Sequence, residues 1–242
     1  MSKTLSSVAV LAVFLAFGLA AQPADAQQAR TFVSGLGSDT NAPNCSRTAP
    51  CRTFQTAHNN TLANGEITVL DPGSYGSVMI NRNISIVNDG VGEAGLLVSG
   101  GGIGIMINAA GAAVTLRGLT IKGIGFGGGN AVIFNTGGSL RVENCVIRNL
   151  ETSESVSSAI SFRLPGHGTT SLTVVRSAVF GNGSAGLLAD GIGATLRVGE
   201  TAVEANAPGW LMRNGGALLS YGDNAFGFNS GPSSPAPVIG MK

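Results

Sequence analysis

Few side chains in this sequence have the types and spacing that catalysis or metal binding requires. Only 11% of the 242 residues are charged, with 14 Lys and Arg against 13 Asp and Glu. A glycoside hydrolase needs two carboxyl groups a few ångströms apart, and a calcium site needs several carboxylate oxygens. Glu151 and Glu154 are close in sequence but fall in a polar stretch typical of a solvated loop. No catalytic residue can be assigned, and we expect neither a cofactor nor a metal.

The tripeptide Gly166-His167-Gly168 matches a Gly-His-Gly element of polygalacturonases. The resemblance to that family ends there, because its Asn-x-Asp, its upstream Asp-Asp pair and its downstream Arg-x-Lys are absent from the chain. A triad of His167, Asp190 and a serine could be drawn, but no nucleophile elbow marks it. We expect His167 to be an exposed loop residue, which would take part in binding where its loop overhangs neighbouring strands.

Three cysteines, Cys45, Cys51 and Cys145, can be interpreted from their positions. Cys45 and Cys51 bound a short loop, and in an exported protein a disulfide is the usual state of such a pair. The alternative, a metal site, would need further Cys or His ligands, and only His58 is near. Cys145 falls in an inward column of the repeat described next, so we expect it to be a small buried residue.

A sequence motif that occurs four times predicts the fold in which these residues lie. The copies are Val114–Ile121, Leu140–Ile147, Leu172–Val179 and Leu196–Val203. A period of roughly 20–50 residues is typical of stacked repeats. Apolar and polar residues alternate with the period of two that indicates a strand. The alternation slips by one residue, and we expect a bend, at Gly118, Asn144, Arg176 and Glu200.

A second short strand precedes each copy, and a fifth follows the last one. These strands are residues 104–108, 131–135, 159–163, 186–190 and 209–213. The pattern predicts an all-β fold, a right-handed single-stranded parallel β-helix, because no single coil can bury its own apolar face. The alternative is an antiparallel β-sandwich, whose hairpins could use the Asn-Gly pairs at 64, 182 and 214. Columns that repeat in one direction favour the parallel fold.

The second strands all end on a polar residue that should face outward. In coils stacked ~4.8 Å apart, Asn108, Asn135, Arg163, Asp190 and Arg213 would form one ladder. Arginine presents a planar fork that suits carboxylates. We therefore predict that Asn135, Arg163, His167, Asp190 and Arg213 bind an acidic glycan. The alternative is that Asp190 only neutralises the two arginines, in surface pairs that contribute ~0–1 kcal/mol each.

The chain divides into four predicted regions. Residues 1–26 have the positive start, apolar run and Ala-x-Ala end of a cleaved signal peptide, with an N-terminal membrane anchor as the alternative. Residues 27–65 should hold the Cys45–Cys51 loop and a helix from Thr53 to Ala63 that caps the open end of the stack, with His58 on its surface. Residues 66–229 should form the β-helix, and residues 230–242 a disordered tail.

The first predicted coil resembles a known family. Val69-Leu-Asp-Pro-Gly-Ser-Tyr75 and Ile80-Asn-Arg-Asn-Ile-Ser-Ile86 are similar to the opening strand, Pro-Gly-x-Tyr turn and strand pair of secreted bacterial right-handed β-helix proteins of the pectate-lyase-like superfamily. The resemblance extends over roughly residues 30–229. It implies the fold and an exported bacterial protein, secreted or periplasmic. It does not imply one activity, because the superfamily holds lyases, hydrolases, esterases and non-enzymatic adhesins.

Two function classes remain for this sequence. The first is an exported, non-catalytic β-helix protein, which would be a surface, envelope or carbohydrate-binding protein. The second is a polysaccharide-acting enzyme, a lyase or glycoside hydrolase. A polysaccharide or acidic glycan is the partner expected of the enzyme and of the carbohydrate-binding form of the first class. A net charge of +1 gives no electrostatic case for nucleic acid, and no later apolar run is long enough to span a membrane after signal cleavage. The sequence specifies no oligomeric state.

Overall fold

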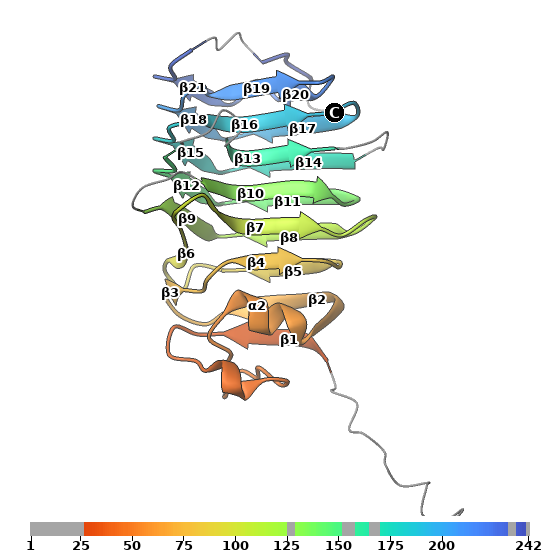
Figure 1. Ribbon diagram of the computed structural model, residues 1–242, viewed down its shortest axis with the longest axis vertical. Helices are drawn as coiled ribbons and strands as arrows, with labels where there is room; N and C mark the ends of the chain where they lie inside the picture. Colours follow the sequence, from red (N-terminus) through yellow and green to blue (C-terminus); the bar gives the residue numbers. More distant parts are fainter. Residues whose placement is uncertain (1–26, 125–128, 152–157, 165–169, 232–235, 241–242) are drawn as a thin grey trace, which may run out of the picture.

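The computed structural model describes residues 27–124, 129–151, 158–164, 170–231 and 236–240. These residues wind into a parallel β-solenoid with three sheets running along its axis (Figure 1). Every pairing between its strands is parallel. The predicted parallel β-helix is confirmed, and the antiparallel sandwich is wrong. The predicted signal peptide, residues 1–26, lies outside the described residues.

The strands of each sheet come from successive coils. The eight-stranded sheet holds β1 (Gln28–Val33), β2 (Thr61–Val69), β5 (Ile84–Val87), β8 (Ala113–Arg117), β11 (Ser139–Glu143), β14 (Thr170–Val175), β17 (Ala194–Gly199) and β20 (Ala217–Ser220). The seven-stranded sheet holds β3 (Gly73–Ser74), β6 (Ala94–Val98), β9 (Leu119–Gly123), β12 (Val146–Arg148), β15 (Ala178–Phe180), β18 (Ala202–Glu204) and β21 (Ala225–Gly227). The six-stranded sheet holds β4 (Val78–Ile80), β7 (Gly102–Asn108), β10 (Gly129–Thr136), β13 (Ser158–Arg163), β16 (Ala185–Asp190) and β19 (Trp210–Arg213).

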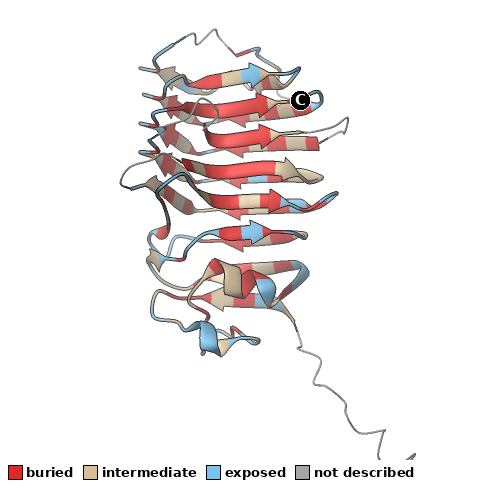
Figure 2. Ribbon diagram, in the orientation of Figure 1, coloured by how far each residue is buried: buried red, intermediate tan, exposed pale blue. Residues whose placement is uncertain are grey.

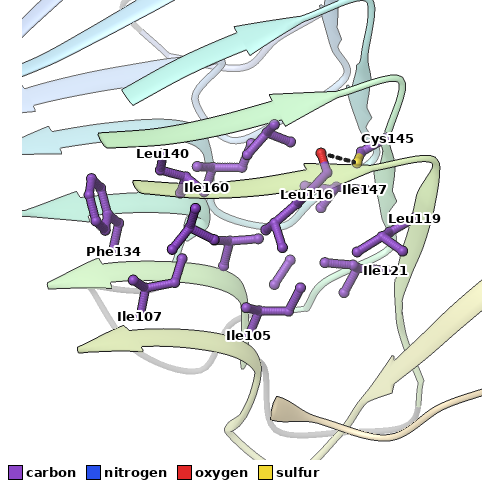
Figure 3. Packing of buried hydrophobic residues seen from close by; sticks show 14 of the residues in the cluster. Ile105, Ile107, Leu116, Leu119, Ile121, Phe134, Leu140, Cys145, Ile147 and Ile160 are labelled. Atoms are coloured by element: carbon purple, nitrogen blue, oxygen red, sulfur yellow. Dashed lines mark hydrogen bonds between the residues drawn. The ribbon is translucent and has the colours of Figure 1, made fainter. Parts of the chain in front are cut away.

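The predicted columns form the core of the solenoid. Leu140 pairs with Val114 on one side and with Leu172 on the other, and Ile147 likewise pairs with Ile121 and Val179. Val142, Ile147, Val174 and Val179 are all buried, as red interior strands in Figure 2 illustrate. Figure 3 shows side chains from all three sheets meeting between them, among them Ile105, Leu116 and Ile121. Burial of such columns is what stabilises coils that could not fold singly.

The predicted bends are sharp corners between the eight-stranded and seven-stranded sheets. Gly118, Asn144, Arg176 and Glu200 all adopt positive φ, from 47° to 72°. After each corner a side chain turns inward, and Cys145, Ser177 and Thr201 are buried there as expected. Cys145 Sγ lies 3.7 Å from the Leu116 carbonyl oxygen (Figure 3), and burial raises the pKa of its thiol to about 11. Cys145 is therefore a core residue held in the thiol form.

Buried asparagines join the coils at the next corner. Asn182 Nδ2 donates to Asn206 Oδ1 at 2.8 Å, and Asn206 Nδ2 donates to Asn229 Oδ1 at 3.2 Å. Asn206 Nδ2 also donates to the Val179 carbonyl oxygen, and Asn229 Nδ2 to that of Val203. These amides satisfy backbone groups that the turn would otherwise leave buried without partners.

The N-terminal end differs in detail from the prediction. Helix α2 spans only Phe54–Asn59, and a short 3₁₀ turn, η1, spans Asp39–Asn41. Thr53 is the N-cap, but the helix does not reach Ala63, because Thr61 pairs with Gln28 and begins β2. His58 is buried rather than on the surface, because α2 turns the face with Phe54, Ala57 and His58 toward the stack. The predicted disulfide between Cys45 and Cys51 is present.

The C-terminal end holds two further differences. Met212, predicted to be inward, is 41% exposed, because β19 is the last strand of its sheet and no described strand covers it. Part of the tail that we predicted to be disordered pairs with the stack. Val238 forms a parallel bridge with Ser220, supported by hydrogen bonds of 2.8 Å from Ser220 N to Pro237 O and from Ile239 N to Ser220 O. These bonds satisfy part of the open edge of β20.

Candidate functional site

The predicted outward ladder lies along the six-stranded sheet. Arg163 pairs with Asp190, and Asp190 with Arg213, in the backbone register of β13, β16 and β19. Asn135 Nδ2 donates to Asn108 Oδ1 at 3.1 Å. Asp190 accepts a hydrogen bond from Asn214 Nδ2 at 2.7 Å, and Arg163 Nε donates to Ser161 Oγ at 2.8 Å. The backbone therefore aligns Arg163, Asp190 and Arg213, whereas a register shift after Phe134 pairs Asn108 with Thr136, so that Asn135 joins the ladder only through its side chain. The role of these residues in binding stays a prediction. His167 lies outside the described residues.

A hollow that the sequence did not predict lies on the outer face of the eight-stranded sheet. This C-terminal groove has a volume of about 700 Å³, within the range of small-ligand sites. Strands β11, β14, β17 and β20 form its floor. Its charged lining residues are Arg141, Arg176, Arg197, Glu200 and Asp223, and its larger apolar or aromatic ones are Leu219, Tyr221 and Ile239. No ladder residue lines it.

One carboxylate next to the groove fixes two of its arginines. Glu143 Oε2 lies 2.7 Å from Arg141 Nε, and Glu143 Oε1 contacts Arg176 Nη2. Arg176 Nη1 is also 3.6 Å from Glu200 Oε1. The hydrogen bond from Arg141 and the charge of both arginines lower the pKa of Glu143. Glu143 is therefore a fixed anion that orients guanidinium groups, which is the opposite of a general acid.

The corner conformation brings two long side chains to the groove. Arg176 and Glu200 both have φ of 47°, in the left-handed region where Gly and Asn are favoured. The equivalent corners of earlier coils do use Gly118 and Asn144. A charged residue held in this conformation costs backbone energy, and such residues concentrate at functional sites.

Arg197 differs from the other two arginines of the groove. Within the described residues its guanidinium has neither an ion-pair partner nor a hydrogen-bond acceptor, although Arg141 lies in the same outward column two coils away. Its side chain is partly buried at the groove wall. A guanidinium carries five N–H donors in a planar fork. Arg197 can therefore offer two parallel hydrogen bonds to a carboxylate without first breaking an existing pair.

Tyr221 adds an aromatic ring to the groove that Arg197 lines. A Cβ atom added to Gly199 would lie only 2.7 Å from Tyr221 Cδ2, so the ring rests against the bare backbone of β17. Any side chain at position 199 would displace it. Residues Ile239 and Gly240 line the groove next to this ring, where the tail pairs with β20. The groove therefore combines an aromatic surface, hydrogen-bond donors and two carboxylates, Glu200 and Asp223.

The described residues offer little for metal or membrane chemistry. They include no group of three or more His, Cys, Asp or Glu side chains that could hold a metal ion. None of the described helices is long and apolar enough to cross a membrane. The groove, in contrast, brings charged and aromatic side chains together in one hollow, from which a binding chemistry can be argued.

Part of the lining of this groove could be predicted from the sequence. Arg141 and Arg197 alternate with Thr173 in one outward column of the repeat, which the register confirms. Tyr221 and the tail follow the last copy of the motif and share none of its pattern. Their place could be found only from the folded chain. Comparison with known proteins adds no assignment: no family model, curated protein or solved structure matches the chain.

Proposed function

We propose that this protein is an exported, non-catalytic β-helix protein that binds an acidic polysaccharide in its C-terminal groove. The observation on which this depends is that the open guanidinium of Arg197 and the ring of Tyr221 line one groove of about 700 Å³. The resemblance of the first coil to secreted proteins of the pectate-lyase-like superfamily supports an exported bacterial protein. The disulfide is compatible with an oxidising compartment.

The chemistry of the groove suits a sugar chain better than a purely anionic ligand. Arg141 and Arg176 are already paired with Glu143, so they act as oriented donors to hydroxyl groups more than as free charges. Glu200 and Asp223 supply acceptors for hydroxyl protons. Tyr221 can pack against the apolar face of a sugar ring, because an aromatic side chain offers a rigid contact surface. Arg197 is left to bind an acidic substituent.

The test is calorimetric titration with oligomers of galacturonate and alginate. Arg197→Ala should weaken binding about tenfold to a hundredfold, because a charge-assisted hydrogen bond contributes about 1.5–3 kcal/mol. Arg148→Ala is the matched control, because Arg148 lies on β12 of another sheet and its substitution removes the same charge. Failure of every oligomer to bind, or equal binding by the Arg197→Ala variant, would contradict the proposal.

The same titration tests the predicted ladder. If Arg163 and Arg213 bind the acidic groups instead, the Arg163→Ala/Arg213→Ala double variant should lose affinity while Arg197→Ala does not. Both arginines have other interactions in the fold, so thermal melting must show that the double variant is folded. If the C-terminal groove is the binding site, Arg197→Ala should lose affinity and the double variant should not.

A hydrolytic activity is the second candidate. Glu200 and Asp223 line the same groove, and the Glu200 backbone N–H donates to Asp223 Oδ1 at 3.0 Å, so the two residues adjoin each other on consecutive coils. Inverting and retaining hydrolases both use such a pair. Product release from pectate or alginate, abolished in Glu200→Gln and Asp223→Asn but retained in Arg148→Ala, would establish this activity. Binding without product release leaves the non-catalytic function.

A further inference from the structure

A second hollow lies at the opposite end of the same sheet face. This N-terminal hollow, of about 340 Å³, is lined by Gln28, Arg30 and Phe32 of β1 and by Asn44, Ser46 and Arg47 of the disulfide loop. In β1 the alternate residues Thr31 and Val33 are buried, so Arg30 and Phe32 face outward, as Arg197 and Tyr221 do at the other end.

The two arginines of the N-terminal hollow share one aromatic ring. Arg30 lies 5.5 Å and Arg47 5.8 Å from the centre of the Phe32 ring. Arg30 is fixed by Glu66, at 2.8 Å, and its Nε donates to Thr68. In the part of the chain that the structure describes, the Arg47 guanidinium has no ion pair or hydrogen bond. Its donors are free to bind an anion, and the ring holds its position.

The register makes both hollows parts of one surface. Two outward columns run the length of the sheet. The first is Arg30, Glu66, Ser85, Thr115, Arg141, Thr173, Arg197 and Leu219. The second is Phe32, Thr68, Val87, Arg117, Glu143, Val175 and Gly199, with Tyr221 following. Strands ~4.8 Å apart place β1 about 34 Å from β20.

We propose that the N-terminal hollow and the C-terminal groove are the two end subsites for a single extended acidic polysaccharide, lying along the solenoid axis. The inference rests on the proposed function and names the length and path of its ligand. Each end has an aromatic ring, at least one guanidinium fixed by a glutamate, and one open guanidinium, Arg47 or Arg197. Between the two hollows the first column carries the short polar side chains Ser85 and Thr115, and the second carries Val87 and Arg117, which pairs with Asp89.

Two weak subsites on one rigid face give a dependence on chain length. A chain too short to span the ~34 Å between the ends can occupy only one subsite at a time. A longer chain that has bound one end meets the other at a millimolar effective concentration, which can raise affinity by about 10²–10⁴ without any new kind of contact. The affinity should therefore rise abruptly at the chain length that spans both subsites. This rise should exceed the gradual one that longer chains show because they can occupy a single subsite in more registers.

The experiment is a calorimetric titration of the full chain with size-fractionated oligogalacturonates and oligoalginates, from dimers to oligomers longer than ~34 Å. We expect a step of about a hundredfold or more in Kd, with one oligomer bound per protein. Arg47→Ala should remove the step and lower the number of short oligomers bound per protein from two, one at each end, to one at the groove. Arg148→Ala should change neither. Arg47 is an exposed loop residue, and thermal melting verifies that its variant is folded.

The outcomes separate this inference from the proposed function. Binding of short oligomers that depends on Arg197 but shows no step, or a step that survives Arg47→Ala, overturns the two-ended site and leaves the groove as the binding site. Absence of binding at every length overturns both. A step that disappears in Arg47→Ala, with one short oligomer fewer bound by each of the Arg47→Ala and Arg197→Ala variants, is the result that the geometry predicts.

Discussion

The two ends of the solenoid cover their exposed strand edges and core in different ways. At the N-terminal end the edge of β1 is covered by the disulfide loop, with hydrogen bonds from Phe32 N to Cys45 O and from Cys51 N to Phe32 O. Helix α2 closes the core beneath it, and Phe54 and Tyr75 are fully buried with ring centres 5.0 Å apart. At the C-terminal end the described part of the tail contributes one bridge, between Ser220 and Val238, and one small buried side chain, Ala236.

The difference shows in which side chains are exposed at each end. Phe54 at the N-terminal end is fully buried, whereas Phe228 at the C-terminal end is 93% exposed. The tail contacts β20 mainly through its backbone, while α2 contributes a packed apolar face. A terminal repeat without a packed cap opens more readily than the interior of the stack. We infer that the groove, which uses the tail as one side, lies at the more dynamic end and the N-terminal hollow at the more rigid one.

The largest expected effect is a difference in the free energy of unfolding between the Phe54 and Phe228 variants. Phe54→Ala should lower the free energy of unfolding by about 3–5 kcal/mol, because it removes a fully buried aromatic side chain and leaves a cavity. Phe228→Ala should change it by less than about 0.5 kcal/mol, as is usual for exposed positions. Urea unfolding followed by circular dichroism measures both. Similar losses in the two variants would show that the ends are equally packed.

Removal of the disulfide between Cys45 and Cys51 should cause the next largest loss of stability. Replacing Cys45 and Cys51 together by serine should cost about 2 kcal/mol, because the crosslink closes only a short loop in the unfolded chain. The same double variant should release Arg47 from its position over Phe32 and weaken the predicted binding of long oligomers. Cys145→Ser, which touches no disulfide, is the control for loss of a sulfur atom. An unchanged melting temperature without the disulfide would contradict a covalently secured N-terminal end.

The repeated coils, the N-terminal capping helix and the disulfide could be predicted from sequence, whereas the extent of that helix and the structure of the C-terminal end could not. Columns such as Val114, Leu140, Leu172 and Leu196 repeat because each coil imposes the same inward position on its neighbour, so pattern alone identifies them. The corners at Arg176 and Glu200 were also visible as slips in the alternation. Their consequence, a groove lined by both side chains, depends on the left-handed backbone that directs them outward.

The length of the capping helix and the pairing of the tail escaped prediction, because tertiary pairing overrides local preference there. The helix stops at Asn59 because Thr61 Oγ1 donates to the Ala57 carbonyl oxygen and contacts Thr31 Oγ1, committing the next residues to β2. The tail is rich in Pro and Ser, which indicates disorder, yet β20 offers it an unpaired edge. Neither the edge nor the buried position of His58 can be read from residue spacing.

The smallest effect we expect is a pH dependence confined to the N-terminal end. His58 is 1% exposed, its Nε2 has no hydrogen-bond partner among the described residues, and its Nδ1 lies a long 3.5 Å from Asn59 Oδ1. Burial lowers the pKa of His58 below its ordinary value of 6.5, the Asn59 contact opposes this, and the positive charge of Arg82 adds to it.

The sign of the effect follows from that lowered pKa. The unfolded chain binds a proton to this histidine more readily than the folded chain does, so stability is complete above about pH 6.5 and falls as the pH drops toward the lowered folded pKa. Hydrogen exchange at pH 8 and pH 5 should show faster local opening of α2 and β2 at pH 5. His58→Gln should reduce this difference, and His167→Gln, the only other histidine in the chain, should retain it. Equal protection of α2 at both pH values in the wild type would mean that the N-terminal end accommodates a charged His58. Its rigidity would then come from the disulfide and Phe54 alone.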